Sequence, residues 1–311
     1  MTALSTLGRR QMADFLSHSP RAHDVDEVLQ LRRDEIHAKG DLEYASVGVR
    51  LALLEEASHS ELGRFLLCNQ GLDGAWTHQI AYRRPRERQV AAELPAFDKF
   101  LMDEAPTILA TQERFDIFQR IVQASLRPAM TLASMPCGLM ADLLTLDFTG
   151  LKDVHLVGID LDQESIDQAT RFSKRIPAAA SASFEVSDAW RVPGAARFDV
   201  LTSNGLNIYE RDPQRERTLY ERFFTLLKPG GLLVTSFLTP PPTGDPQMPW
   251  DLSFVDAQAL LKQRVLFTEI LGVRWQHFST AADMKAKLHA VGFGRAEIHY
   301  DRARLFPTVS A

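Results

Sequence analysis

The carboxyl-terminal two-thirds of the chain alternates between two kinds of segment. From Thr131 onward, short apolar runs are followed by longer stretches in which apolar residues recur every three or four positions. Short apolar runs are typical of buried strands, and parallel strands need long crossover connections, which amphipathic helices supply. The alternation therefore predicts a parallel sheet with helices packed on its faces. We expect strands at residues 130–134, 155–159, 182–186, 198–202 and 231–237.

The residues at the ends of the expected helices fit this arrangement. Asp162 is suited to cap a helix over 163–174, because its carboxylate can accept from free amides of the first turn. Asp212 followed by Pro213 favours the start of another helix, and the Lys-Pro-Gly-Gly run at 228–231 is expected to end it.

The last segment of the chain predicts a closing pair of strands. A helix at 281–290 and Gly292 precede two more apolar runs, at 295–300 and 306–309. Two strands joined as a hairpin add an antiparallel element to a parallel sheet. The predicted fold is therefore α/β, a Rossmann-like seven-stranded mixed sheet.

Residues 1–114 have a different pattern of apolar residues. Apolar residues recur three and four positions apart, as at Leu62, Phe65 and Leu66, which is typical of amphipathic helices. We predict a helical cap or lid over 1–114, followed by a main domain over 115–311. Within that domain, residues 239–279 follow the fifth expected strand as a long insertion suited to covering a substrate.

Charge argues against a nucleic-acid partner. The chain has a formal net charge of −5, whereas nucleic-acid binders need a basic surface for phosphate contacts. The only basic cluster that stands out is the stretch at 83–88, which contains four arginines. Its ordinary interpretation is a solvated helix face.

The cysteines and the hydropathy predict a cytoplasmic protein with no membrane partner. Cys68 and Cys137 lie far apart, form no CxxC pair, and so suggest neither a disulfide framework nor a zinc site. No apolar stretch approaches the roughly 18 to 20 residues that span a bilayer, and the amino terminus has no signal-peptide core. No metal site is expected, since HExxH is also absent.

Polar residues follow several of the expected strands, where open α/β sheets bind their ligands. Asp160 ends the second strand, and a carboxylate there can accept both hydroxyls of a ribose. Asp188 follows the third strand and is suited to accept from the adenine amino group, with Trp190 beside it to cover the ring. Asn204 and Tyr209 follow the fourth strand. This pattern predicts an adenosine-containing cofactor.

Three phrases resemble one known family. Gly158–Ala169, which reads GIDLDQESIDQA, is similar to the ribose-binding strand and helix of the class I S-adenosylmethionine-dependent methyltransferases. FDVLTSNG at 198–205 resembles that family's fourth strand, and LLKPGGLLV at 226–234 its fifth. Their order and spacing carry the resemblance, which runs from about Phe115 to the carboxyl terminus. It implies that S-adenosylmethionine is the cofactor and methyl transfer the reaction.

The first loop departs from the family's pattern. Ser134, Pro136, Gly138 and Met140 stand where an acidic residue and three glycines are usual. Only glycine takes a positive φ without strain, so Met140 is the most unfavourable of these replacements. The methionine part of the cofactor is still expected to lie against residues 136–138.

The resemblance implies the following cofactor-binding residues: Ser134, Pro136, Cys137, Gly138, Asp160, Leu161, Asp188, Ala189, Trp190, Asn204, Gly205 and Arg114. Arg114 is included because a guanidinium matches a carboxylate bidentately, and the cofactor carries one. Six of these residues have a structural alternative, and for Asp188 it is an ordinary acidic residue of a loop. Asp160 can cap a helix, Trp190 can pack at a rim, Asn204 can form a turn, Cys137 can fill space and Arg114 can lie on the surface.

Methyl transfer from S-adenosylmethionine needs few catalytic side chains. The sulfonium supplies the leaving group, so the enzyme mainly aligns the reactants and excludes water. If a general base is used, His78 and Tyr209 are the candidates. The acceptor is expected to be a small molecule, partly apolar or aromatic, enclosed with the help of Trp76, Tyr82, Tyr209 and Trp250. The oligomeric state is left open.

Two other functions are compatible with parts of the pattern. A nicotinamide-dependent oxidoreductase shares the sheet and the ribose carboxylate, but the first loop lacks GxGxxG and no Tyr-x-x-x-Lys pair is present. A non-catalytic S-adenosylmethionine-binding regulatory protein is permitted by the loss of glycines from the first loop. Binding without turnover would distinguish it from an enzyme.

Overall fold

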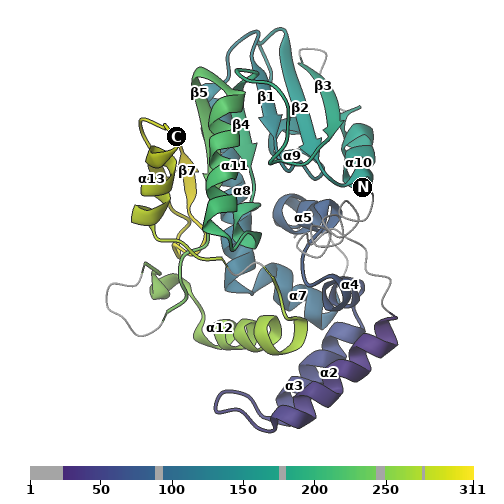
Figure 1. The fold of residues 1–311 in the computed structure, drawn as a ribbon. Helices are drawn as coiled ribbons and strands as arrows, with labels where there is room; N and C mark the ends of the chain where they lie inside the picture. Colours follow the sequence, from purple (N-terminus) through teal and green to yellow (C-terminus); the bar gives the residue numbers. More distant parts are fainter. Residues whose placement is uncertain (1–23, 88–93, 175–179, 243–248, 275–276) are drawn as a thin grey trace, which may run out of the picture.

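A seven-stranded sheet forms the centre of the main domain (Figure 1). The computed structural model describes residues 24–87, 94–174, 180–242, 249–274 and 277–311. The strand order is β3-β2-β1-β4-β5-β7-β6, with β7 antiparallel to both of its neighbours. The strands are β1 Thr131–Ser134, β2 Val154–Asp160, β3 Ala180–Val186, β4 Phe198–Ser203, β5 Leu227–Ser236, β6 Glu297–His299 and β7 Thr308–Ser310. The predicted α/β class and the mixed seven-stranded sheet are confirmed.

One strand boundary was predicted wrongly. The run at 228–231 was expected to separate a helix from the fifth strand, but β5 already begins at Leu227. Gly230 takes a φ of 74°, and the register between β4 and β5 shifts, so that Phe198 pairs with Leu227 whereas Val200 pairs with Leu232. The glycine lets the chain bulge and resume pairing, instead of ending the element.

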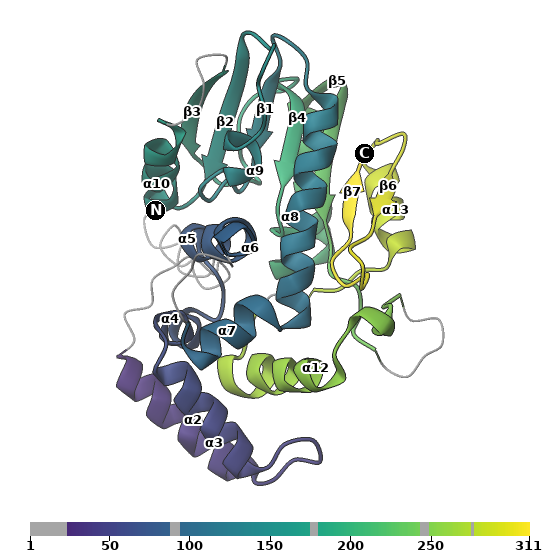
Figure 2. The same ribbon diagram turned by 180° about the vertical axis from the view of Figure 1, so that it is seen from behind.

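Helices cover both faces of the sheet. One face carries α8 (Pro106–Ser125), α9 (Ala141–Leu144) and α10 (Gln163–Ser173), and the other carries α11 (Pro213–Leu226) and α13 (Ala281–Ala290). Figures 1 and 2 show α11 and α8 on opposite sides of the strands. Alternation along the strands explains this layering, because successive side chains point to opposite faces. Leu132 packs on the α8 side, and Ala133 on the α11 side.

The predicted helix starts are confirmed by their caps. The Asp162 carboxylate accepts from the Glu164 and Ser165 amides at the start of α10. Asp212 accepts from the Gln214 amide at the start of α11. These bonds satisfy amides that have no partner within the helix.

The amino-terminal region is helical and lies beyond the carboxyl edge of the sheet (Figure 2). Its described elements are α2 Val25–Lys39, α3 Val47–Ser58, α4 Glu61–Asn69, α5 Gly74–His78, the π-helix η1 Gln79–Arg83, α6 Arg84–Glu87 and α7 Ala96–Asp103. Residues 1–23 and 88–93 of the predicted cap lie outside the described residues. The proposed boundary at 114/115 falls inside α8, which therefore joins the two regions.

The cap and the insertion share one hydrophobic core. The insertion contains η3 Leu252–Phe254, α12 Ala257–Arg264 and the π-helix η4 Val265–Leu271, while residues 243–248 and 275–276 lie outside the described part. Leu62 and Phe100 of the cap belong to the same buried cluster as Leu266 of the insertion. No helix of the described residues has the length and apolarity needed to cross a membrane.

Candidate functional site

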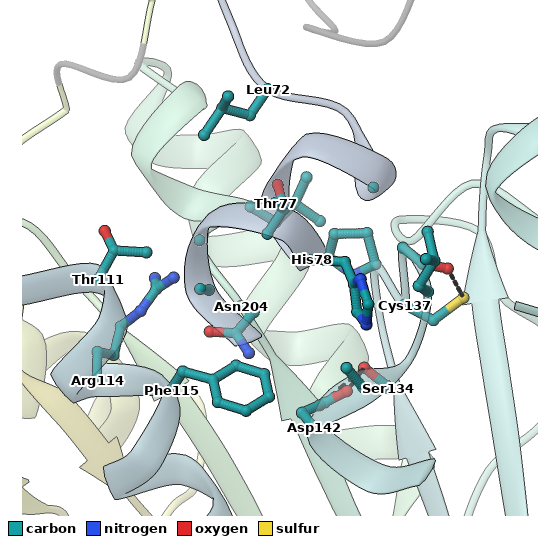
Figure 3. A pocket seen from close by; sticks show the side chains of 18 of the residues that line it. Leu72, Thr77, His78, Thr111, Arg114, Phe115, Ser134, Cys137, Asp142 and Asn204 are labelled. Atoms are coloured by element: carbon teal, nitrogen blue, oxygen red, sulfur yellow. Dashed lines mark hydrogen bonds between the residues drawn. The ribbon is translucent and has the colours of Figure 1, made fainter. Parts of the chain in front are cut away.

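A cavity lies where the carboxyl ends of the strands meet the cap (Figure 3). Its walls come from α5 and η1 of the cap, from α8, and from the loops that follow β1, β2 and β4. Ten predicted residues line it: His78, Arg114, Ser134, Pro136, Cys137, Gly138, Asp160, Asn204, Gly205 and Tyr209. The fold therefore brings together side chains that are up to 131 positions apart, from His78 to Tyr209.

The loop after β1 is tied to the neighbouring strands. The Cys137 amide donates to the Ile159 carbonyl at 2.9 Å, and the Met135 amide donates to the Thr202 carbonyl at 2.8 Å. Met140 takes a φ of 55°, the conformation expected to be unfavourable there. Its side chain is fully buried, so packing compensates for the strained backbone where the family usually has glycine.

Asp160 stands at the edge of the cavity with its carboxylate held in place. It is 4% exposed and accepts from the Gly138 amide at 2.9 Å and the Asp162 amide at 3.1 Å. Asp162, not Asp160, caps α10. A carboxylate oxygen accepts more than one hydrogen bond, so Asp160 retains capacity for ribose hydroxyls.

Asp142 is a site residue that the sequence did not single out. This buried carboxylate lines the cavity and accepts from Ser134 Oγ at 3.0 Å and Thr202 Oγ1 at 2.6 Å. Burial raises the pKa of its carboxyl group. Asp142 thus supplies a carboxylate next to Ser134, which stands in the family's acidic position. The only sequence signal was an acid in the first turn of the helix after the loop.

Arg114 is buried and incompletely paired. The side chain lies on α8, 5% exposed, with Nη1 donating to Ser236 Oγ at 3.1 Å and its guanidinium carbon 3.8 Å from the centre of the Phe306 ring. Its Nε has no partner among the described residues. Desolvation lowers its pKa to about 9, so the guanidinium remains charged at neutral pH. The surface alternative is excluded by this burial.

The two candidate bases both line the cavity. His78 packs against Tyr82 and Phe172, with ring centres 5.1 Å apart in each pair. Burial and, to a smaller extent, the nearby Arg83 lower its pKa to about 4, so the imidazole is neutral at pH 7 and a weak base. Its Nε2 is buried without a partner among the described residues. Tyr209 lies on η2 (Asn207–Tyr209), after β4.

Cys137 behaves as a packing residue in the wall of the cavity. Burial raises the pKa of its thiol well above the usual value, and the nearby Asp160 and Asp142 raise it further. A nucleophilic cysteine needs the thiolate, which this environment disfavours.

Four predicted cofactor residues do not line the cavity. Leu161 is 46% exposed, and Ala189 packs in the core of the α11 face. The Asp188 carboxylate accepts from the Trp190 amide at 3.1 Å, and Trp190 Nε1 donates to the Arg215 carbonyl on α11. The adenine contacts assigned to these residues stay predictions, at an edge of the sheet outside the enclosed space.

The aromatic residues proposed to line the enclosure are separated by the fold. Tyr209 lines the cavity, but Trp76, Tyr82 and Trp250 are absent from its described walls. Trp76 packs against Phe65 within the cap, and Trp250 Nε1 donates to Thr239 Oγ1. Spacing along the chain could not distinguish an aromatic residue of the cavity from one of the surrounding core.

Comparisons with known proteins identify the domain. A family model described as a methyltransferase domain matches residues 137–231. A crystal structure titled as a possible exported protein from Bordetella parapertussis is 41% identical, with a TM-score of 0.87, and the match covers 92% of this chain and 94% of that one. Magnesium protoporphyrin IX methyltransferase from Synechocystis PCC 6803 is more distant, at 16% identity, a TM-score of 0.48 and coverages of 75% and 95%. No curated protein sequence matches the chain significantly.

The matched segment contains part of the cavity's lining. Residues 137–231 hold β2, β3 and β4 with the loops that follow them, including Asp160 and Asn204. The seven-stranded mixed sheet agrees with the fold expected from the sequence. Residues 137–231 therefore form a methyltransferase domain, which takes S-adenosylmethionine as the cofactor for methyl transfer.

Proposed function

We propose that this enzyme methylates a small molecule held in the cavity beneath the cap. The observation that carries the proposal is the direct packing of the cap on the first loop. A Cβ built on Gly74 would lie 2.9 Å from the Cα of Gly138. The cap therefore closes over the carboxyl edge of the sheet, and such an enclosed site suits a small acceptor better than a polymer.

Charge pairing supports a small acceptor over a nucleic acid. Within the basic stretch, Arg83 pairs with Glu87, Arg84 with Asp103 and Arg86 with Asp116, while Arg88 lies outside the described residues. Arginines that are already neutralised release few counterions from a phosphate backbone, so they contribute little to nucleic-acid affinity.

The residues of the cavity fit the cofactor's chemistry. S-adenosylmethionine supplies a methyl group on a sulfonium leaving group. Asp160 would accept the ribose hydroxyls, and the backbone at 136–138 would face the methionine part. The cap would exclude water, while Asn204, whose Oδ1 is buried without a described partner, would orient the acceptor. His78 and Tyr209 remain the candidates for receiving the acceptor's proton.

Methyl transfer to a defined class of acceptor is directly measurable. Purified protein is offered tRNA, duplex DNA, a peptide library and a metabolite extract, each with methyl-labelled S-adenosylmethionine. We expect label in the extract alone, and less of it with Asp160→Ala. Asp167→Asn on the exposed face of α10 serves as the control. Label in a macromolecule, with none in the extract, would contradict the proposal.

We also propose that the enzyme works in the cytoplasm. Both cysteines are free, Cys137 being buried and Cys68 partly buried, as suits a reducing compartment. Fractionation of cells that produce the chain with a carboxyl-terminal tag tests this, and recovery outside the cytoplasm would contradict it.

A further inference from the structure

Arg114 carries a buried charge to which no carboxylate of the described residues is hydrogen-bonded. Its single hydrogen bond among the described residues runs from Nη1 to the neutral hydroxyl of Ser236. Nε has no partner, and no hydrogen bond from Nη2 is found in the described part of the chain. In a guanidinium, Nε and one terminal nitrogen form an edge that binds a carboxylate bidentately. Among the residues that the structure describes, none supplies a hydrogen-bond acceptor to this edge of Arg114.

The carboxylates nearest to Arg114 are already engaged. Tyr209 and Asp301 both act on Arg114 electrostatically. The two oxygens of Asp301 already accept from the Leu305 and Phe306 amides, at 3.0 and 2.8 Å. Glu113, the preceding residue, pairs with Arg302 at the surface. A buried charge without a partner destabilises a fold, so its presence needs a compensating function.

Arg114 lies away from the ribose carboxylate. Ser236, its partner, ends β5, whereas Asp160 ends β2, and β1 and β4 separate these two strands. At about 4.8 Å between neighbouring strands, the two strand ends are roughly 14 Å apart. Figure 3 shows Arg114 and Thr111 at the opposite side of the cavity from Cys137. The Arg114 end of the cavity therefore lies remote from the ribose carboxylate, beside Gly205 of the loop after β4.

The walls at this end are mainly apolar. The Phe306 ring lies 3.8 Å from the Arg114 guanidinium, Ile108 and Thr111 line the cavity from earlier turns of α8, and Tyr209 adds an aromatic ring. A cation among apolar walls recognises a ligand that has one anionic group attached to an apolar body.

We propose that Arg114 determines specificity by binding a carboxylate of the acceptor, so that the substrate class is a small organic acid with an apolar or aromatic part. This inference rests on the proposed small-molecule function. Arg114 contacts the acceptor in it and takes no part in proton transfer.

The first experiment locates the acceptor by charge. A metabolite extract is split on an anion exchanger, and each fraction is incubated with the full-length protein and methyl-labelled S-adenosylmethionine. We expect label in the retained fraction. Label only in the unretained fraction would overturn the charge assignment while small-molecule methyl transfer stands. Label in neither fraction would overturn both.

Variants of Arg114 then test whether this residue binds the negative charge of the acceptor. With the retained fraction, Arg114→Gln should raise KM about 10- to 100-fold, the change expected for loss of a hydrogen bond to a charged group, with kcat little altered. Arg114→Lys should retain part of the affinity for the acceptor, since lysine keeps the positive charge but cannot bind a carboxylate bidentately. Arg120→Gln, on an exposed turn of the same helix, is the matched control. An unchanged KM in Arg114→Gln would overturn the proposal.

Calorimetry distinguishes the acceptor's carboxylate from the cofactor's own. S-adenosylhomocysteine carries an amino-acid carboxylate, and 5′-methylthioadenosine does not. We expect Arg114→Gln to bind each within about threefold of the unmodified protein, a change below 1 kcal/mol. A loss of at least tenfold for S-adenosylhomocysteine alone would assign Arg114 to the cofactor and overturn the proposal.

Thermal unfolding separates this role from a structural one. Because the unpaired guanidinium opposes folding, Arg114→Gln should have a Tm equal to or above that of the unmodified protein. A marked fall in Tm together with a similar loss for every ligand would show that Arg114 supports the fold instead, which overturns the proposal.

Discussion

Gly74 of the cap lies against Gly138 of the first loop, so a side chain at either position would force the two segments apart. A Cβ on Gly74 would lie 2.9 Å from both Gly138 Cα and Ser165 Oγ. Real Cβ atoms do not approach backbone this closely, so the contact depends on glycine. Cap and cofactor loop are therefore coupled directly, without intervening side chains.

Substitution of Gly74 should weaken cofactor binding through this contact. Gly74→Ala is expected to raise the Kd for S-adenosylhomocysteine about tenfold or more by displacing the first loop. Gly48→Ala is the matched control, since its Cβ would meet only Ser46 Oγ at 3.9 Å in an exposed turn of α3. Calorimetry on both variants makes the comparison, and equal affinities would show that the loop tolerates displacement of the cap.

Loss of the Asp160 carboxylate should reduce cofactor affinity. Asp160→Ala is expected to weaken S-adenosylhomocysteine binding by about 1.5 to 3 kcal/mol, the scale of hydrogen bonds to a charged group. Isothermal titration calorimetry measures this, with Asp167→Asn as a control of similar charge change on α10. An unaltered Kd in a folded Asp160→Ala protein would remove Asp160 from the site.

Asp142 should stabilise the first loop. Asp142→Ala leaves the Ser134 and Thr202 hydroxyls without their common acceptor, and a buried group left unsatisfied costs about 1 to 3 kcal/mol. We expect a lower free energy of unfolding in urea and weaker cofactor binding. Asp142→Asn, which keeps one acceptor oxygen, should lose less. Equal stability of all three proteins would contradict this role.

His78 should titrate near pH 4. Its pKa in the folded protein is lowered from 6.5 to about 4, so between these values the unfolded chain binds the extra proton. The sign follows from linkage: the free energy of unfolding falls as pH falls from 6.5 towards 4. NMR of the imidazole measures the midpoint, and His78→Gln should reduce the acid sensitivity. A midpoint near 6.5 would contradict the burial argument.

The cap should be required for turnover and for solubility. Deleting residues 1–105, which leaves α8 intact, would expose Leu266 and its neighbours in the insertion, because they share a core with the cap. We expect aggregation or binding of a hydrophobic dye, and no methyl transfer. A truncated protein that stays monomeric and fully active would show that the cap is an independent domain.

Local rules were sufficient for the class of the sheet and for the starts of two helices in the main domain. The sheet class followed from the alternation of apolar runs and helices, and the starts of α10 and α11 followed from Asp162 and Asp212, whose side chains act on amides two or three residues away. Asp160 could be placed at the cavity because parallel strands end at one edge of the sheet. These features depend on residues near one another in sequence, which is why the sequence by itself determined them.

The tertiary structure decided which side chains share the cavity. Asp142 joins Ser134 and Thr202, Arg114 is buried beside Ser236, and Trp190 turns towards α11 and away from the cavity. Each of these outcomes depends on contacts between elements that are distant in the chain, where packing fixes the direction of a side chain. The type of a residue determines which hydrogen bonds and ion pairs its side chain can form. Only the packed fold determines which partner lies close enough to form them, and which charged side chain has no partner.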